Sequence, residues 1–186
     1  DILFGAAVRW NDRWSLDATL QANNQTHDVA RTTVQARYSH SAYRVLNAAY
    51  RVNNQTSPNS TFMDVGWQWP LHDLWGGSDI GGGEGRGLGE GRWYSVARLN
   101  YNPLDKKMVE SVIGFEYDAG CWLGRVVYER LQSTTSTSRS RILFQLEFVG
   151  LARVGSSPLK TLRDNIPRYQ YLREDLAPTT RFTTYD

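Results

Sequence analysis

The stretch GRWYSVARLNYN, residues 91–102, alternates between apolar and polar side chains. Its apolar members on one side are Trp93, Ala97, Leu99 and Tyr101, and its polar members on the other are Arg98 and Asn100. Successive side chains of a strand point to opposite faces, so this spacing predicts a strand with one apolar and one polar face. The stretch DRWSLDATLQ, residues 12–21, repeats the order of turn, arginine, tryptophan and alternating strand. The motif therefore marks the start of a strand, and the chain uses it twice.

The same alternation runs through nearly the whole chain and predicts about nine strands of roughly ten residues each. The predicted strands cover residues 4–10, 13–22, 31–39, 43–52, 62–69, 93–101, 109–117, 121–131 and 141–149. A tilted strand needs roughly 9–11 residues to cross a lipid bilayer. We therefore predict an all-β fold, an antiparallel transmembrane β-barrel segment that is part of a larger barrel. The strand pattern is already under way at Ile2, so we expect a fragment of a longer protein.

Composition excludes several other classes of protein. The chain has 186 residues, enough for one ordinary domain, and its net charge of +2 gives no reason to expect nucleic-acid binding. No run of about 18 apolar residues is present, so no transmembrane helix is expected. The mean hydropathy of −0.52 still allows a membrane barrel, because such a barrel faces lipid with only every second residue of each strand.

The connections between the predicted strands alternate between short and long. The short ones are 11–12, 40–42 and 118–120, and the longer ones are 23–28, 53–60, 103–107 and 133–138. Outer-membrane barrels have short periplasmic turns and longer extracellular loops, so the short connections predict the periplasmic rim. Residues 71–91 fall on that rim but contain the glycine-rich sequence GGSDIGGGEGRGLGEG (76–91), which we expect to be a mobile insert. We assign residues 1–151 to barrel strands and 152–186 to a periplasmic or luminal tail.

The tryptophans gather at one rim of the predicted barrel. Those beside short connections are Trp10, Trp14, Trp67, Trp69, Trp93 and Trp122, and Trp75 lies within the insert. An indole ring is half apolar and half polar, and transmembrane barrels carry girdles of such residues at the membrane interfaces. A soluble barrel has no reason to collect them, so this is the strongest argument from the residues for a lipid environment.

Two other kinds of barrel are possible on the pattern alone. The Gly-x-Trp start of GRWYSV resembles the opening motif of the lipocalins, which are soluble carriers of apolar ligands. That motif belongs in a first strand, whereas about five predicted strands precede it here. A small self-contained barrel with a structural or adhesive role is the other alternative, although a count near nine and the start within a strand argue against closure.

No enzymatic or metal site is expected. The three histidines, His27, His40 and His72, lie in or beside connections, without a strand-borne nucleophile or carboxylate to work with. Three scattered histidines and one cysteine do not make a metal site, and no cofactor is indicated. Charged residues on the polar faces are expected to pair in a water-filled interior; these are Arg98, Glu110, Glu116, Arg125 and Glu129. Cys121 cannot form an internal disulfide: it is either a buried thiol or paired outside this chain.

The C-terminal half is similar to the last barrel strands of the LptD family of outer-membrane lipopolysaccharide-assembly proteins. The motifs that carry the resemblance are Trp69-Pro70, Arg92-Trp93, Gly114-Phe115-Glu116-Tyr117, Cys121-Trp122 and the stretch 125–130. FQLEFVGLARVG (144–155) resembles the family's closing strand, and LRDNIPRYQ (162–170) resembles the tail that follows it. The resemblance is specific over about residues 61–171. Two features depart from the family pattern: Trp122 stands where some members carry a second cysteine, and residues 76–91 lengthen a turn.

The resemblance implies a large barrel in the bacterial outer membrane that inserts lipopolysaccharide into the outer leaflet. It implies an LptE-type lipoprotein plug, an N-terminal periplasmic domain linked by a disulfide to Cys121, and the barrel-assembly machinery as a folding partner. It also makes the strand from Arg141 to Leu151 one lip of a lateral gate. The gate residues expected to meet lipid are Ile142, Phe144, Leu146 and Phe148; those expected to face the lumen are Arg141, Gln145 and Glu147, and Gly150 follows the strand.

Overall fold

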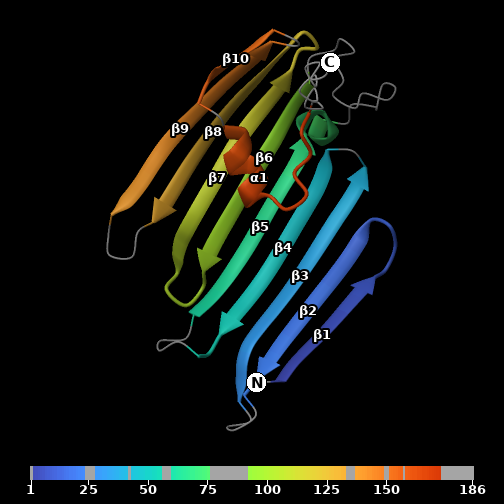
Figure 1. Cartoon of the computed structure of the whole chain (residues 1–186), viewed down its shortest axis with the longest axis vertical. Coiled ribbons are helices and arrows are strands. Elements are labelled where there is room, and N and C mark those ends of the chain that lie inside the picture. Colours follow the sequence, from blue (N-terminus) through green and yellow to red (C-terminus); the bar gives the residue numbers. More distant parts are fainter. Residues whose placement is uncertain are drawn as a thin grey trace, which may run out of the picture.

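The computed structural model describes residues 2–23, 28–41, 43–55, 60–75, 92–132, 137–148, 151–156 and 158–172. Ten antiparallel strands form one sheet in which spatial order follows sequence order (Figure 1). The strands are β1 (Ile2–Arg9), β2 (Trp14–Ala22), β3 (Val29–Ser41), β4 (Arg44–Asn53), β5 (Ser60–Pro70), β6 (Arg92–Asn102), β7 (Lys107–Asp118), β8 (Trp122–Gln132), β9 (Ser138–Phe148) and β10 (Ala152–Gly155). The helical elements are a 3-10 helix, η1 (Leu71–Trp75), and α1 (Pro158–Asn165).

The all-β prediction is confirmed, and each of the nine predicted strands is present as β1 to β9. The count of about nine differs by the four-residue β10, which is too short to show an alternating pattern. Among the described residues β1 pairs only with β2, so these ten strands do not close into a barrel of their own. An open sheet is neither the small self-contained barrel nor the lipocalin-like barrel, and it is the arrangement expected of a segment of a larger one. No helix in the described ranges is long and apolar enough to span a membrane.

The pairing register gives the sheet two unlike faces, because it aligns the alternating side chains of neighbouring strands. We call the apolar one the outer face. One row of directly paired residues on it crosses eight strands: Trp14, Tyr38, Leu46, Trp67, Ala97, Ile113, Tyr128 and Ile142. We call the opposite one the inner face. One of its rows is Arg37, Asn47, Gly66, Arg98 and Val112.

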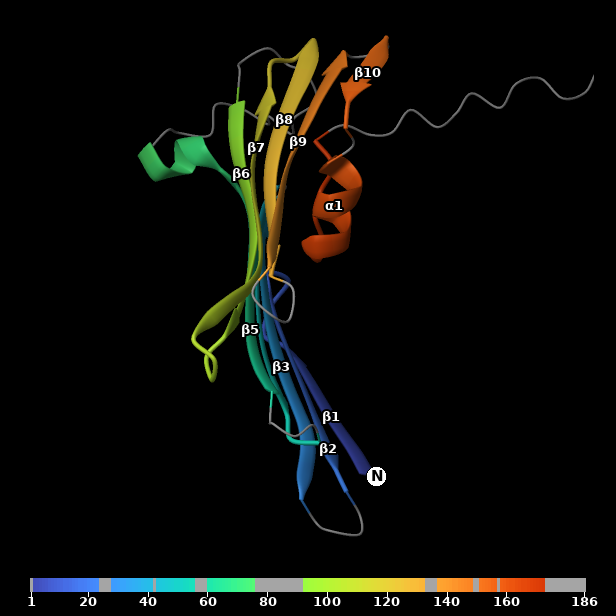
Figure 2. The same cartoon turned by 90° about the vertical axis from the view of Figure 1, so that its left-hand side faces the viewer.

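The C-terminal segment, residues 158–172, lies across the inner face (Figure 2). Leu162 and Ile166 are fully buried there against three valines of the sheet, which are Val96, Val112 and Val127. Pro158 occupies the first helical position, where its missing N–H is not needed. The spacing of Leu159, Leu162 and Ile166 is helical, so α1 had a signal in the sequence that the strand pattern of the rest of the chain obscured.

Two sequence features shape the short connections. Asn11 closes the β1–β2 turn, because its Oδ1 accepts hydrogen bonds from the backbone N of Arg13 (2.9 Å) and of Trp14 (2.8 Å). In the β7–β8 turn, Gly120 has a φ of 87°, which favours glycine, and its N donates to Asp118 Oδ1 at 2.9 Å. We call the end of the sheet that carries these turns the short-turn end, and the opposite end the loop end.

Gly114 of β7 is the tightest point of the inner core. A Cβ at this position would lie 2.8 Å from Val127 Cγ2 and 2.9 Å from the backbone oxygen of Val126. We expect Gly114→Ala to destabilise the fold by about 1–3 kcal/mol, because the backbone must shift to admit the methyl group. The measurement is the denaturant midpoint of the full-length protein in detergent. Gly5→Ala is the matched control, since nothing lies within 4 Å of that Cβ, and an equal loss in both variants would contradict the packing argument.

Candidate functional site

Large apolar side chains remain exposed along the outer face. Examples are Leu46, Ile113, Phe115, Val126 and Tyr128, each more than a third exposed. On the outer face of β9, Ile142 is 71 % exposed and Phe144 is 50 % exposed. A contiguous apolar surface of this kind marks contact with a membrane or another protein.

Aromatic rings line the outer face at the short-turn end. The ring centroids of Trp14 and Tyr38 lie 4.5 Å apart, and those of Tyr38 and Trp69 lie 6.4 Å apart. Further along the sheet, Tyr117 sits between two indoles, with centroid distances of 4.8 Å to Trp93 and 5.3 Å to Trp122. Ring rows of this kind suit the boundary between lipid and water, where one end of each ring meets polar groups.

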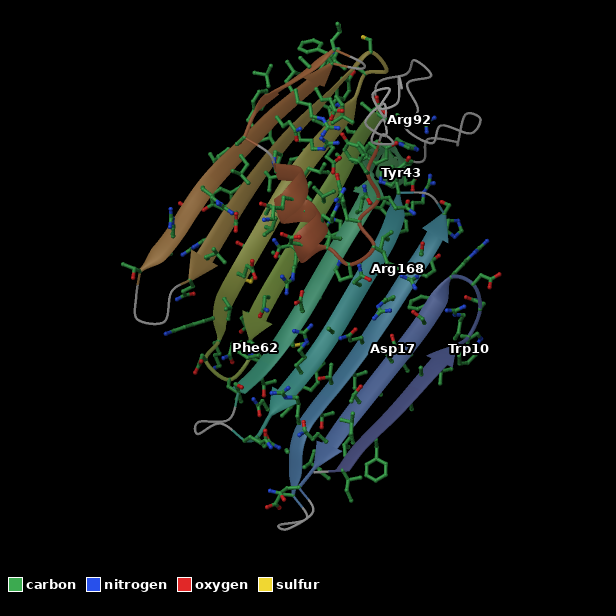
Figure 3. The ribbon with its side chains drawn as sticks, viewed as in Figure 1. Trp10, Asp17, Tyr43, Phe62, Arg92 and Arg168 are labelled. Atoms are coloured by element: carbon green, nitrogen blue, oxygen red, sulfur yellow. The ribbon has the colours of Figure 1, made fainter. Side chains whose placement is uncertain are left out.

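All six tryptophans that the sequence singled out lie toward the short-turn end. Trp10 is at the tip of the β1–β2 hairpin (Figure 3) and is 86 % exposed, and Trp67 donates its indole N–H to Ser95 Oγ at 3.1 Å. Tyr38 and Tyr117 also belong to this row, although they were not among the residues predicted from the sequence. Both had a readable signal, since each lies on the apolar phase of its strand close to a short connection.

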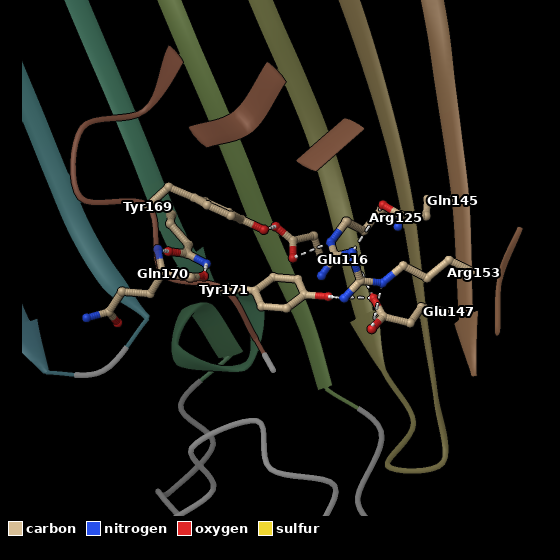
Figure 4. A network of polar contacts seen from close by, with 9 residues as sticks. Glu116, Arg125, Gln145, Glu147, Arg153, Tyr169, Gln170 and Tyr171 are labelled. Atoms are coloured by element: carbon tan, nitrogen blue, oxygen red, sulfur yellow. Dashed lines mark hydrogen bonds and ion pairs between the residues drawn. The ribbon is translucent and has the colours of Figure 1, made fainter. Parts of the chain in front are cut away.

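A buried ionic cluster occupies the inner face of β7, β8 and β9 at the short-turn end (Figure 4). Arg125 is its centre and is fully buried. Its Nε lies 3.2 Å from Glu116 Oε2, and its Nη1 lies 3.5 Å from Glu147 Oε2 and 3.3 Å from Gln145 Oε1. Arg153 Nε, from β10, lies 3.2 Å from Glu147 Oε1. Two arginines thus face two glutamates, so the cluster carries no net charge in the low-dielectric interior.

The C-terminal segment completes the hydrogen bonding of this cluster. Tyr169 donates its hydroxyl to Glu116 Oε1 at 2.6 Å, and Tyr171 donates its hydroxyl to Glu147 Oε2 at 2.7 Å. The Arg125 guanidinium lies over the Tyr171 ring, 4.9 Å from its centroid. The two tyrosines therefore bind the segment to the sheet through the charges that the sheet buries.

The segment also contacts β4, β5 and β6 through polar groups. Gln170 and Gln68 of β5 exchange two hydrogen bonds, from Gln170 N at 2.9 Å and from Gln68 Nε2 at 2.7 Å. Asn47 Nδ2 of β4 donates to the Pro167 oxygen at 2.9 Å. Arg98 Nη1 of β6 donates to Asn165 Oδ1 at 2.7 Å. The segment therefore reaches across most of the inner face.

Charged residues that the sequence placed on one face are paired there. Arg98 Nε lies 3.0 Å from Asp64 Oδ1 and Arg98 Nη1 lies 3.5 Å from Glu110 Oε2, and Arg141 pairs with Glu129. At the short-turn end Arg44 makes two bonds to Asp73 of η1, and this ion pair lowers the pKa of Asp73 below its usual 3.8. The pairs of Arg98 and Arg141 agree with the prediction of charge pairing on the polar faces.

Burial, together with the nearby Glu116 carboxylate, holds the pKa of Tyr169 well above its usual 10.0. A phenol whose folded pKa is raised contributes stability at every pH below its ordinary pKa and loses that contribution as the pH rises through the raised one. We expect Tyr169 to ionise only when the C-terminal segment leaves the sheet in strong alkali. The difference in tyrosinate absorbance between the full-length protein and its Tyr169→Phe variant should correspond to one tyrosine that ionises late and abruptly. A step at the usual pKa would contradict the burial of this hydroxyl.

The gate residues occupy both faces of β9. Ile142, Phe144 and Phe148 point outward and are exposed, whereas Gln145 and Glu147 are buried on the inner face. Gly150 lies outside the described residues, as do residues 76–91 of the insert and His27. Cys121 is an exposed free thiol in the β7–β8 turn.

The other two histidines, His40 and His72, lie within the described residues. His40 stacks near Tyr38, and His72 lies 3.3 Å from Asp73. Within the described ranges, no three His, Cys, Asp or Glu residues come together in a way that could hold a metal ion.

Comparison with known proteins relates the whole chain to one family. It is 55 % identical over 186 residues to LPS-assembly protein LptD of Albidiferax ferrireducens and 56 % identical over 188 residues to that of Paracidovorax citrulli, covering 100 % of this chain in each case. The chain belongs to the LptD family. LptD of Cupriavidus necator is 33 % identical over 190 residues. The chain spans 23 % of the length of the first two LptD proteins and 21 % of the third, and no family model matches it.

Proposed function

We propose that this chain forms a C-terminal part of the barrel wall of an LptD protein, and that the whole protein inserts lipopolysaccharide into the outer leaflet of the bacterial outer membrane. The identity of 55 % over the full chain to proteins named for lipopolysaccharide assembly carries the proposal. The resemblance of residues 61–171 to the last barrel strands of the family favours the C-terminal position.

The outer face is suited to contact with lipid. Strands β1 to β9 are 8 to 13 residues long, and large apolar side chains are exposed along this face. This matches the strand length and the one-sided apolarity of a transmembrane barrel. The aromatic rows at the short-turn end would then mark one membrane interface, and the short turns would be periplasmic.

The inner face is suited to a polar, water-filled lumen. Arginine, aspartate, asparagine and glutamine side chains cover β2 to β5 on this face, including Asp17, Gln35, Arg37, Arg51 and Asp64. A saccharide chain could travel over such a surface while its acyl chains remain on the apolar side. Because residues 144–155 resemble the family's closing strand, we propose β9 as one lip of the lateral gate, with Ile142, Phe144, Leu146 and Phe148 toward lipid and Arg141, Gln145 and Glu147 toward the lumen.

The partners follow from the family resemblance. An LptE-type lipoprotein would fill the lumen, further strands of the same protein would close the barrel, and the barrel-assembly machinery would insert it. Lipopolysaccharide would be the transported substrate, and no catalytic step is needed for transport.

Depletion of the full-length protein in its own bacterium tests the function. Newly made lipopolysaccharide is expected to stop reaching the cell surface and to accumulate behind the outer membrane. The measurement is the surface fraction of pulse-labelled lipopolysaccharide, with plasmid-borne wild-type protein as the control. A normal surface fraction after complete depletion would contradict the proposal.

Cys121 is proposed to form a disulfide with the N-terminal periplasmic domain. It is exposed at the proposed periplasmic rim, where oxidation is favourable. The full-length protein is expected to migrate differently on a non-reducing gel from the Cys121→Ser variant, and identically on a reducing gel. Equal mobility on both gels would contradict the proposed disulfide of Cys121 and would not affect the proposed transport function.

A further inference from the structure

β10 runs back along the edge of β9 that faces away from β8. Its four residues pair with the last four of β9, from Ala152 opposite Phe148 to Gly155 opposite Gln145. The turn between them is closed by Leu151 N, which donates to the Phe148 oxygen at 3.2 Å. β10 thus supplies backbone partners to the half of β9 nearest the short-turn end.

Two side chains, those of Ser156 and Arg153, hold β10 at this place. Ser156 Oγ accepts a hydrogen bond from Phe144 N at 2.9 Å and donates one to the Phe144 oxygen at 3.1 Å, which extends the pairing by one residue. Arg153 pairs with Glu147 and donates to the Tyr171 hydroxyl at 2.9 Å, so β10 shares the buried cluster that holds the C-terminal segment. These contacts fix β10 against the edge of β9 beyond the turn that connects the two strands.

Gly155 permits the close approach. Its φ is +110°, and a Cβ at this position would lie 2.3 Å from the Phe144 oxygen, a distance at which the two strands must separate. Any L side chain at residue 155 is therefore expected to push β10 away from β9.

The other half of the same edge is open. Among the described residues, Ser138–Leu143 have backbone partners only on β8. This open half is six of the eleven residues of β9, and Arg139 and Arg141 are exposed along it. An unpaired edge of this kind accepts an extended strand.

We propose that β10 divides the far edge of β9 into two parts: a docking edge at Ser138–Leu143 for one further strand of the barrel, and a capped part at Gln145–Phe148 that this strand does not reach. The inference rests on the proposed function, in which β9 is a lip of the gate. Backbone groups without partners are very unfavourable in lipid, so a seam can stay open there only if something else satisfies its edge. β10 does this for β9, and the barrel is left with a short seam that opens easily at the short-turn end.

A disulfide between β9 and β10 tests the proposal in the full-length protein in outer membranes. Leu146 and Val154 are directly paired on the outer face, so the double variant Leu146→Cys/Val154→Cys is expected to cross-link in most molecules after mild oxidation. The matched control is Ile113→Cys/Tyr128→Cys, an outer-face pair between β7 and β8. Single-cysteine variants control for pairing with other thiols.

Adding Gly155→Ala is expected to lower cross-linking of the 146–154 pair several-fold and to leave the control pair unchanged. The oxidised 146–154 protein is expected to deliver lipopolysaccharide to the surface, because the capped edge is the working state. Failure of the 146–154 pair to cross-link while the control pair does so would overturn the proposal. Loss of delivery on oxidation, restored by a reductant, would also overturn it, because β10 would then have to leave β9. Neither of these two contradicting results predicts the outcome of the depletion experiment, so the proposed transport function is tested separately.

Discussion

Replacing Arg125 by methionine is expected to destabilise the fold by about 3–5 kcal/mol and to release the C-terminal segment from the sheet. Arg125 is fully buried between Glu116 and Glu147; without it Glu116 would lose its cation and Glu147 would keep only the partly exposed Arg153. A buried ionised carboxylate that loses its cation is strongly unfavourable, and the two tyrosines that hold the segment donate to these same two carboxylates. Limited proteolysis of the full-length protein should then cut within residues 158–172, and the denaturant midpoint should fall.

Arg37→Met is the matched control for this prediction. Arg37 also lies on the inner face and pairs with a carboxylate, at 3.4 Å from Asp17 Oδ2, but the two side chains are 32 % and 37 % exposed. An exposed pair of this kind contributes no more than about 1 kcal/mol. If both variants lost the same stability, or if Arg125→Met kept residues 158–172 protected from protease, the buried cluster would not be the anchor of the segment.

Placing an arginine at Phe144 is expected to lower the amount of full-length protein in the outer membrane several-fold. Phe144 is half exposed on the outer face near the middle of β9. An arginine facing lipid at mid-depth destabilises a transmembrane barrel by about 2–4 kcal/mol, and the effect falls to about 0–1 kcal/mol near the interfaces. Phe148→Arg, at the short-turn end of the same strand, should therefore have a smaller effect. Quantitative immunoblots of outer-membrane fractions, together with surface lipopolysaccharide, measure both variants.

Thr33→Arg provides the control on the opposite face. Thr33 is partly buried on the inner face and is paired directly with Thr19 and Arg51. A water-filled lumen solvates a new charge there, so normal protein levels are expected. If Phe144→Arg showed normal protein levels in the outer membrane and normal delivery of lipopolysaccharide to the surface, the outer face would not contact lipid. The proposal that β9 is a lip of the gate would then also be contradicted.

The strands could be predicted from the sequence because their signal is local. Side chains alternate with a period of two, so residues 141–149 or 93–101 show an apolar and a polar face without knowledge of any neighbour. The charged residues on the polar phase could be predicted in the same way, and Arg98, Glu116 and Arg125 were. The family resemblance also predicted where this chain lies in a larger barrel, because the motifs of residues 61–171 occur in the same order as those of the family's last barrel strands.

The pairing of those residues is a property of the tertiary structure. Arg125 meets Glu116 and Gln145 because the register sets them opposite one another, and register depends on how whole strands align. The continuous apolar row from Trp14 to Ile142 has the same origin. Tyr38 and Tyr117 contact tryptophan rings only because the neighbouring strands that carry these tryptophans lie beside them.

The sequence by itself determined the strands, their two faces and the rim that carries the tryptophans, since each follows from the residue types within about ten positions. Only the tertiary structure decided that residues 158–172 cross the inner face and that β10 covers half the edge of β9. Those contacts join residues far apart in the chain, such as Gln170 and Gln68, or require one backbone approach, as at Gly155. The period of α1 could indicate a helix, but the surface on which Leu162 and Ile166 pack is formed by strands far away in the chain.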